Sequence, residues 1–224
     1  MIEFRDVSHS FDGRRVVSDV SVELPERRIG IVGANGSGKS TLARMINALV
    51  VPDTGTVVVD GLDAAKDKRR VRRRVGFIFS DPDRQIIMPT VREDIELSLT
   101  RSALSRSQRR DRALTVLERF GLADHADQPS STLSGGQKQL LALAAVFVTE
   151  PAIIVADEPT TLLDLRNSRM LRRVFADLDV QLIVVTHDLD LVSDFDRVLV
   201  IDNGAITVDD VPDVALPAYR EAMA

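Results

Sequence analysis

The feature that most constrains the fold is the octapeptide GANGSGKS at residues 33–40, which matches the pattern G-x-x-x-x-G-K-[ST]. An apolar run, Ile29–Val32, precedes it, and a helical pattern over residues 39–49 follows it and stops before Pro52. A strand, a glycine-rich loop and a helix in this order form a phosphate-binding loop, whose backbone N–H groups approach the phosphates of a nucleotide. Such a strand normally lies in a parallel sheet that helices cover. The octapeptide therefore predicts an α/β fold.

The rest of the chain supports that fold class. Residues 2–7 and 16–24 alternate like two paired strands joined by the turn-like sequence DGRR. From about Pro89 to Leu122 the pattern becomes helical, with many Arg and Glu residues, and strand–helix alternation resumes after it. We therefore expect an α/β protein with an inserted helical subdomain. The other strand-like runs are residues 56–61, 75–79, 152–157, 181–186 and 197–202.

Composition and charge exclude several classes of protein. The chain has 224 residues and no cysteine, so it has neither a disulfide framework nor a thiolate metal site. Its N-terminus is charged and alternating, unlike a secretory leader. The longest apolar run, residues 140–148, is far shorter than the ~20 residues of a membrane-spanning helix. A net charge of −5 argues against general nucleic-acid binding, and we expect no nucleic-acid partner.

One basic run, KDKRRVRRR at residues 66–74, departs from that acidic balance. It is either a patch for anionic lipid headgroups or nucleic acid, or the solvated face of a helix. A charge run is usually a solvated face, and we favour that interpretation.

Polar side chains at the ends of two later strands complete a nucleotide site. Asp157 ends the strand-like run 152–157 and is expected to hold Mg²⁺ together with Ser40, while Lys39 bridges the β- and γ-phosphates. Glu158 follows directly and can orient or deprotonate an attacking water. His187 follows another strand, and its position favours a contact with the γ-phosphate. This set predicts hydrolysis by in-line attack of water, without a covalent enzyme intermediate.

A second loop, LSGGQ at residues 133–137, also has the composition of an anion-binding site at a helix start. It precedes the helical run QKQLLALAAVFV and lies about 100 residues after the first loop. One small chain therefore carries two candidate phosphate loops.

From Phe11 to His187, these motifs and their order resemble the ABC-type ATPases, of which LSGGQ is the signature loop. The resemblance implies a P-loop NTPase fold with a RecA-like parallel sheet core, an antiparallel β subdomain and an inserted helical subdomain. It divides a single domain, residues 1–224, into the β subdomain and core at 1–88 and 150–224 and a helical subdomain at 89–149. Two such ATPase chains pack head to tail, so that the signature loop of one closes on the nucleotide of the other.

The resemblance also implies a role for each matching residue, with ATP and Mg²⁺ as cofactors. Phe11 matches the aromatic residue that stacks on adenine. Asp157 and Glu158 match the magnesium and catalytic carboxylates, and His187 matches the switch histidine. The phosphate-loop positions are Gly33, Asn35, Gly36, Ser37, Gly38, Lys39, Ser40 and Thr41. The positions that face the partner subunit are Ser134, Gly135, Gly136 and Asp164, the last at the end of the interface loop TTLLD, residues 160–164.

Two positions depart from the family pattern. The family usually has Gln directly after the strand-like run VGFIF, where its side chain reaches Mg²⁺ and the attacking water, and this chain has Ser80. A serine hydroxyl is shorter and would need a bridging water, and Gln85 lies five residues further on in a loop. We hypothesise that Ser80 weakens the link between magnesium binding and the partner's movement. Leu140 is the second departure, since the family usually has Arg there.

The segment FSDPDRQIIMPTVREDI, residues 79–95, resembles the ATPases of energy-coupling-factor (ECF) importers for vitamins and for cobalt or nickel. The run QKQLLALA resembles the biotin-type members most. This implies a peripheral subunit on the cytoplasmic face of the membrane, held by a transmembrane scaffold protein and a membrane substrate-binding protein. Two alternatives remain: a soluble ABC ATPase of a non-membrane assembly, such as cofactor assembly, and a nucleotide-dependent binding module that hydrolyses weakly.

Overall fold

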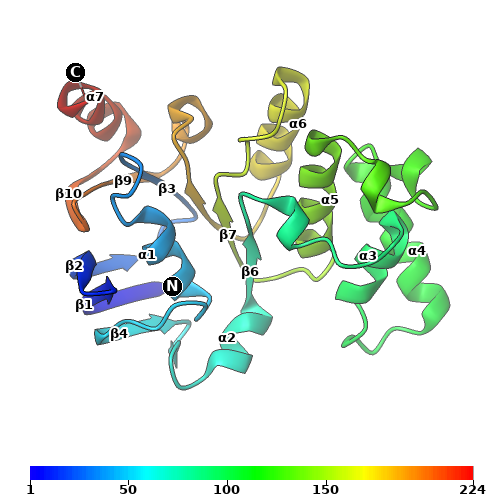
Figure 1. Cartoon of the computed structure of the whole chain (residues 1–224), viewed down its shortest axis with the longest axis horizontal. Helices are drawn as coiled ribbons and strands as arrows, with labels where there is room; N and C mark the ends of the chain where they lie inside the picture. Colours follow the sequence, from blue (N-terminus) through cyan, green and yellow to red (C-terminus); the bar gives the residue numbers. More distant parts are fainter. Residues whose placement is uncertain (224) are drawn as a thin grey trace. The chain divides into compact units, whose positions relative to one another are not determined.

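The computed structural model describes residues 1–223, which form two compact units (Figure 1). Unit 1 contains Met1–Phe77, Ala152–Glu158 and the chain from Leu178 on, and unit 2 contains Ile78–Pro151 and Pro159–Asp177. Residues 159–177, which the sequence analysis assigned to the core, belong to unit 2 in this division. No helix in residues 1–223 is long and apolar enough to span a membrane.

A six-stranded sheet forms the centre of unit 1. Its strand order is β10-β9-β3-β8-β7-β6, and the pairs β9–β3, β3–β8 and β8–β7 are parallel. These parallel strands are almost wholly buried, as their short Val- and Ile-rich runs predict. The strands are β3 (Arg28–Val32), β6 (Val75–Ile78), β7 (Ile153–Asp157), β8 (Gln181–Val185), β9 (Arg197–Asp202) and β10 (Ala205–Asp210).

The last two elements, β10 and helix α7 (Pro212–Ala222), lie beyond the strands that the sequence analysis assigned. β10 pairs antiparallel with β9, and α7 packs on both. The turn between the strands is Asn203-Gly204, with φ of 47° and 82°. An Asn-Gly pair between two alternating runs is a strong hairpin signal, so the sequence did contain the information for β10.

A second, antiparallel sheet of unit 1 has the strand order β2-β1-β4-β5. β1 (Ile2–Phe11) and β2 (Arg14–Leu24) form the predicted hairpin, whose turn at Asp12-Gly13 has φ of 48° and 77°. β4 (Thr54–Val59) and β5 (Leu62–Asp63) complete the sheet. Helix α1 (Lys39–Ile46) ends three residues before the predicted Leu49, because Ala48 adopts a left-handed φ of 57°.

The basic run lies largely in helix α2 (Lys68–Arg74), where every side chain except Val71 is exposed. Arg72 donates to the carbonyl oxygens of Asn47 and Ala48 at 3.4 and 2.8 Å, which satisfies groups at the end of α1. Arg70 and Arg74 pair with Asp67 and Asp60. In the described chain α2 is thus a solvated helix face.

Unit 2 is helical. Helices α3 (Val91–Ser98), α4 (Arg106–Arg119) and α5 (Gly135–Phe147) pack against one another, and α6 (Leu165–Ala176) follows the interface loop (Figure 1). Short 3₁₀ turns at Pro82–Arg84, Ala123–His125 and Ser130–Thr132 connect them, and another, Leu189–Val192, lies in unit 1. Both α4 and α5 begin with a capping box, formed by Ser105 with Gln108 and by Ser134 with Gln137. These caps satisfy N–H groups that the first turn of a helix leaves unpaired.

Candidate functional site

The phosphate loop, residues 33–38, joins the buried end of β3 to the start of α1. Gly33, Gly36 and Gly38 have φ of 152°, 80° and 105°, values that favour glycine. The Ser37 side-chain oxygen is buried without a hydrogen-bond partner in the described chain. Gly38 is the N-cap residue and gives α1 no side-chain cap, so the N–H groups of the first turn face no internal acceptor there. This loop can bind an anionic group of phosphate size.

Lys39, the first residue of α1, points back into the same loop. Its Nζ donates to the carbonyl oxygens of Gly33 and Ala34, both at 2.7 Å, and the residue is 6% exposed. Burial lowers the pKa of Lys39 below its ordinary value, and the negative charges of Glu158 and Asp157 offset part of that shift. The ammonium group is thus held over the loop where phosphates would bind.

Ser40 and Asp157 come together as the sequence predicts. The Ser40 hydroxyl donates to Asp157 Oδ1 at 2.7 Å, and Arg44 Nη2 donates to Oδ2 of the same carboxylate at 3.1 Å. Asp157 is 1% exposed, and a buried carboxylate needs partners for its charge. Ser40 and Arg44 are those partners. Mg²⁺ commonly binds to one or two protein oxygens and completes its shell with phosphates and waters. A hydroxyl and a carboxylate beside a phosphate loop fit that requirement.

Glu158 and His187 form a close pair at the carboxyl ends of β7 and β8. His187 Nδ1 lies 2.7 Å from Glu158 Oε2, and the His187 backbone N–H donates to the same oxygen at 3.3 Å. Glu158 has a left-handed φ of 53°, and its own N–H donates to the Val185 carbonyl at 2.8 Å. This unusual backbone conformation holds the carboxylate next to the imidazole.

Phe11 ends β1 and is 49% exposed, as a residue that stacks on a nucleotide base should be. No sequence motif includes His9, yet its ring lies perpendicular to Phe11 with centroids 4.6 Å apart. His9 Nδ1 is 3.1 Å from Asp53 Oδ1, and Asp53 Oδ2 accepts from the Ser10 N–H at 2.8 Å. His9 and Asp53 therefore hold the end of β1 that carries Phe11. Only the fold brings Asp53 to this point, so no local motif could have identified the pair.

The β1–β2 hairpin also lies directly against the phosphate loop. A Cβ atom at Gly38 would be 2.3 Å from the Val16 carbonyl oxygen, and one at Gly204 would be 2.7 Å from it. The Gly204 N–H donates to the Ser37 carbonyl at 2.9 Å. Two backbone segments thus fix the position of the phosphate loop within unit 1.

Unit 2 contains the signature loop. The Ser134 N–H donates to Gln137 Oε1 at 2.9 Å, and the Gln137 N–H donates to Ser134 Oγ at 3.3 Å. Asp164 caps α6 by accepting from the Asn167 N–H at 2.8 Å. A Cβ at Gly136 would meet the Leu162 carbonyl oxygen at 3.4 Å, whereas one at Gly135 would have no atom closer than 4.0 Å. The signature loop and the interface loop are therefore in contact.

Gln85, in the segment after β6, makes two side-chain hydrogen bonds. Its Oε1 accepts from the Phe79 N–H at 3.3 Å and its Nε2 donates to the Ala142 carbonyl at 3.0 Å. Lys138 pairs with Asp83 at 2.7 Å in the same region. Gln85 thus ties this segment to α5 and is not available to take the place of a glutamine at Ser80.

The predicted residues therefore fall into two groups. Unit 1 contains Phe11, residues 33–41, Asp157, Glu158 and His187, and unit 2 contains Ser80, residues 134–136 and Asp164.

Comparisons with known proteins agree with the fold described above. The family profile described as ABC transporter matches residues 17–161. A chain from Deinococcus radiodurans named as an ABC transporter ATP-binding protein is 52% identical, with 100% of this chain and 99% of that one covered. The biotin transport ATP-binding protein BioM of Rhizobium etli is 43% identical, with 100% and 99% covered. The cobalt import ATP-binding protein CbiO of Syntrophus aciditrophicus is 38% identical, with 96% and 80% covered.

Two solved structures have the same fold. The dimeric ATP-binding cassette MJ0796 in a post-hydrolysis state bound to ADP and Pi has a TM-score of 0.84 at 29% identity, covering 95% of this chain and 99% of that one. The protein cbiO1 of Clostridium perfringens, part of the ABC transporter complex cbiONQ, has a TM-score of 0.84 at 28% identity, covering 99% and 92%.

Proposed function

The chain belongs to the ABC transporter family and is an ATP-binding ATPase of that family; from this membership we propose that it powers an ECF-type importer. The observation that carries the proposal is the similarity to ATP-binding proteins of biotin and cobalt import, which covers 100% and 96% of this chain. The segment at residues 79–95 supports the same class. Biotin is the first candidate for the transported substrate, and cobalt or nickel the second.

In this proposal the residues of unit 1 bind ATP and Mg²⁺. Phe11 stacks on adenine, the loop at residues 33–38 surrounds the phosphates, and Lys39 moves from its two carbonyl partners to the β- and γ-phosphates. Ser40 and Asp157, whose side-chain oxygens lie 2.7 Å apart, would hold Mg²⁺. When bound there, Mg²⁺ would supply positive charge that neutralises the charge developing during phosphoryl transfer.

Hydrolysis is assigned to Glu158 and His187. Glu158 orients the attacking water and accepts its proton, which a carboxylate hydrogen-bonded to an imidazole 2.7 Å away is well placed to do. His187 holds Glu158 before the nucleotide binds and contacts the γ-phosphate afterwards. The His187 side chain is 65% exposed, so it is free to change partner in this way.

The active form in this proposal is a head-to-tail pair of ATPase subunits. Ser134, Gly135 and Gly136 contact the nucleotide of the second subunit, and Asp164 lies at the interface. The capped start of α5 supports this role, because a Cβ at Gly135 would have no atom closer than 4.0 Å and the backbone there has room for an incoming phosphate. The dimeric cassette of the same fold supports the arrangement.

We further propose that a transmembrane scaffold protein and a membrane substrate-binding protein hold the pair at the cytoplasmic face of the membrane. The test is to purify the chain from its host membranes in mild detergent, identify its companions and measure ATPase activity in the same sample. Two small membrane proteins should copurify, and the substrate-binding one would identify the cargo.

The control is Glu158→Gln in the same complex, which should keep its companions and lose hydrolysis. If the chain instead forms a fully active complex without membrane proteins, the importer proposal is wrong and the ATPase assignment remains.

A further inference from the structure

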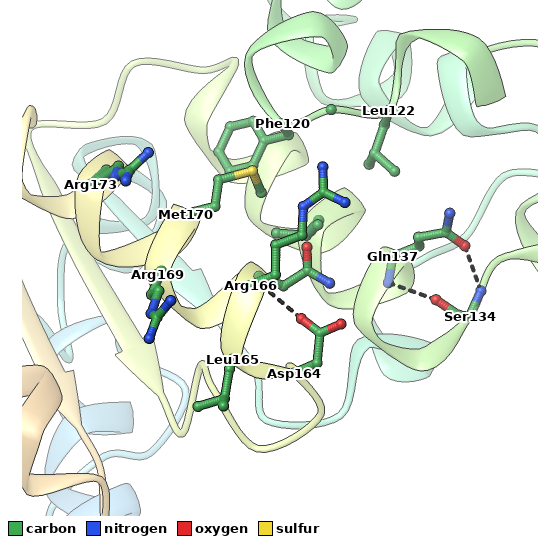
Figure 2. A pocket seen from close by; sticks show the side chains of 13 residues that line it. Phe120, Leu122, Ser134, Gln137, Asp164, Leu165, Arg166, Arg169, Met170 and Arg173 are labelled. Carbon is green, nitrogen blue, oxygen red and sulfur yellow. Dashed lines mark hydrogen bonds between the residues drawn. The ribbon is translucent and has the colours of Figure 1, made fainter.

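A groove in unit 2 lies between the end of α4, the start of α5 and one face of α6 (Figure 2). Its volume is about 1030 Å³, which is large enough for several side chains of a ligand. Figure 2 shows Met170 pointing toward Phe120, with Arg166 and Arg173 to either side of it and Arg169 lower on the same helix. Ser134 and Gln137 line the opposite side.

The groove carries an unbalanced positive charge. Arg166, Arg169 and Arg173 line it against a single carboxylate, Asp164, which leaves a local excess of two positive charges. Asp164 already accepts a hydrogen bond from the Asn167 N–H as the cap of α6. Within residues 1–223 none of the three guanidinium groups has a hydrogen bond or an ion pair.

Two other arginines of the described chain are each neutralised by two carboxylates. Arg92 pairs with Glu96 and Asp127, and Arg197 with Glu26 and Asp209. The three groove arginines instead repel one another, because like charges three and four residues apart on a helix face are neighbours. This repulsion destabilises α6, and an acidic ligand that neutralises the three guanidinium groups would remove it.

We propose that this groove binds an acidic polypeptide segment of a regulatory partner protein. From Arg166 to Arg173 the helix rises about 10 Å, which matches acidic residues on consecutive turns of a partner helix. Met170, together with the buried side chains of Phe120, Leu122 and Leu140, gives the groove an apolar floor for one anchoring side chain. A flat bilayer surface cannot enter such a concave site.

A segment bound in the groove would affect the ATPase through the residues that cap α5 and α6. The same lining includes Ser134 and Gln137, which cap the signature helix, and Asp164, which caps α6. A segment bound across α4, α5 and α6 would restrain both caps at once.

The test uses a synthetic peptide of about 15 residues with glutamates spaced three and four apart around one leucine, titrated onto the intact ATPase. We expect a Kd on the order of 100 µM at low ionic strength. The combined variant Arg166→Glu, Arg169→Glu, Arg173→Glu should weaken binding by about tenfold or more. If that variant does not fold, the corresponding Arg→Gln set replaces it, with an expected loss of about fivefold.

The matched control reverses three other unpaired cations, Lys68→Glu, Arg69→Glu and Arg73→Glu on α2. It changes the net charge equally and should leave peptide affinity within about twofold. Equal loss in both variants would show non-specific attraction and overturn the proposal. Equal binding of a lysine version of the peptide would also overturn it, as would groove-dependent binding to phosphatidylserine vesicles without binding to the peptide.

Discussion

Alanine at Gly38 should be far more damaging than alanine at Gly36, although both glycines lie in the phosphate loop. Both have positive φ, 105° at Gly38 and 80° at Gly36. A Cβ at Gly36 would meet no atom within 4 Å, whereas one at Gly38 would be 2.3 Å from the Val16 carbonyl oxygen. Comparing the two alanine variants therefore separates the cost of a left-handed backbone from the cost of a steric overlap.

The expected magnitudes follow from these two environments. Left-handed backbone costs an ordinary residue about 1–2 kcal/mol, and the lower entropy of unfolded alanine returns about 0.4–1 kcal/mol. Gly36→Ala should therefore lower the free energy of unfolding by about 1 kcal/mol. Gly38→Ala adds an overlap with backbone that costs about 1–3 kcal/mol to relieve, because the Val16 strand must shift. Its total should be about 2–4 kcal/mol.

Urea unfolding without nucleotide measures the decrease in the free energy of unfolding of each variant. An unchanged m-value would show that the unfolded state is the same. ATP titration of the folded variants then reports on the loop itself, which Gly38→Ala should distort and Gly36→Ala should leave nearly intact. If the two variants lost equal stability, the close approach of Val16 would not control the loop and our reasoning would be refuted.

Four further outcomes are expected. His9→Ala should raise the KM for ATP about two- to tenfold with little change in kcat, because an edge-to-face aromatic pair contributes about 0.5–1.5 kcal/mol. The control Ser8→Ala, which removes a hydrogen bond between β1 and Asp19 on β2, should leave the KM unchanged. Glu158→Gln should lower kcat by about 10²–10⁴ and keep ATP affinity, and an active variant would exclude Glu158 as the base. Ser80→Gln should change the basal or partner-stimulated ATPase rate, and two unchanged rates would contradict the hypothesis about Ser80. Burial lowers the pKa of Lys39 below 10.5, so between the lowered pKa and pH 10.5 the unfolded chain binds more protons than the folded one. The free energy of unfolding should therefore rise with pH over that range. Lys39→Met should remove this pH dependence in urea unfolding at increasing pH, and an unaltered pH dependence would contradict the prediction.

Much of the fold could be predicted because it depends on local patterns. The octapeptide at residues 33–40 predicted β3, the loop and α1, and the confirmed run at 197–202 predicted β9. The limits of α1 could not be predicted, since they depend on the φ of Ala48. The hairpin at Asn203-Gly204 had a clear local signal that the sequence analysis did not use.

The sequence by itself determined the chemical groups and their order: two glycine loops, two consecutive carboxylates and a strand-end histidine. These follow from residue type and spacing, which do not require the rest of the fold. Tertiary structure alone decided which residues far apart in the sequence form pairs around these groups. His9 contacts Asp53, Arg44 contacts Asp157, and Gln85 is tied to Ala142. These pairs are separated by 44, 113 and 57 residues in the sequence, so only the packing of the folded chain could bring them together. The physical reason is that a polar group buried by this packing needs a hydrogen-bond partner.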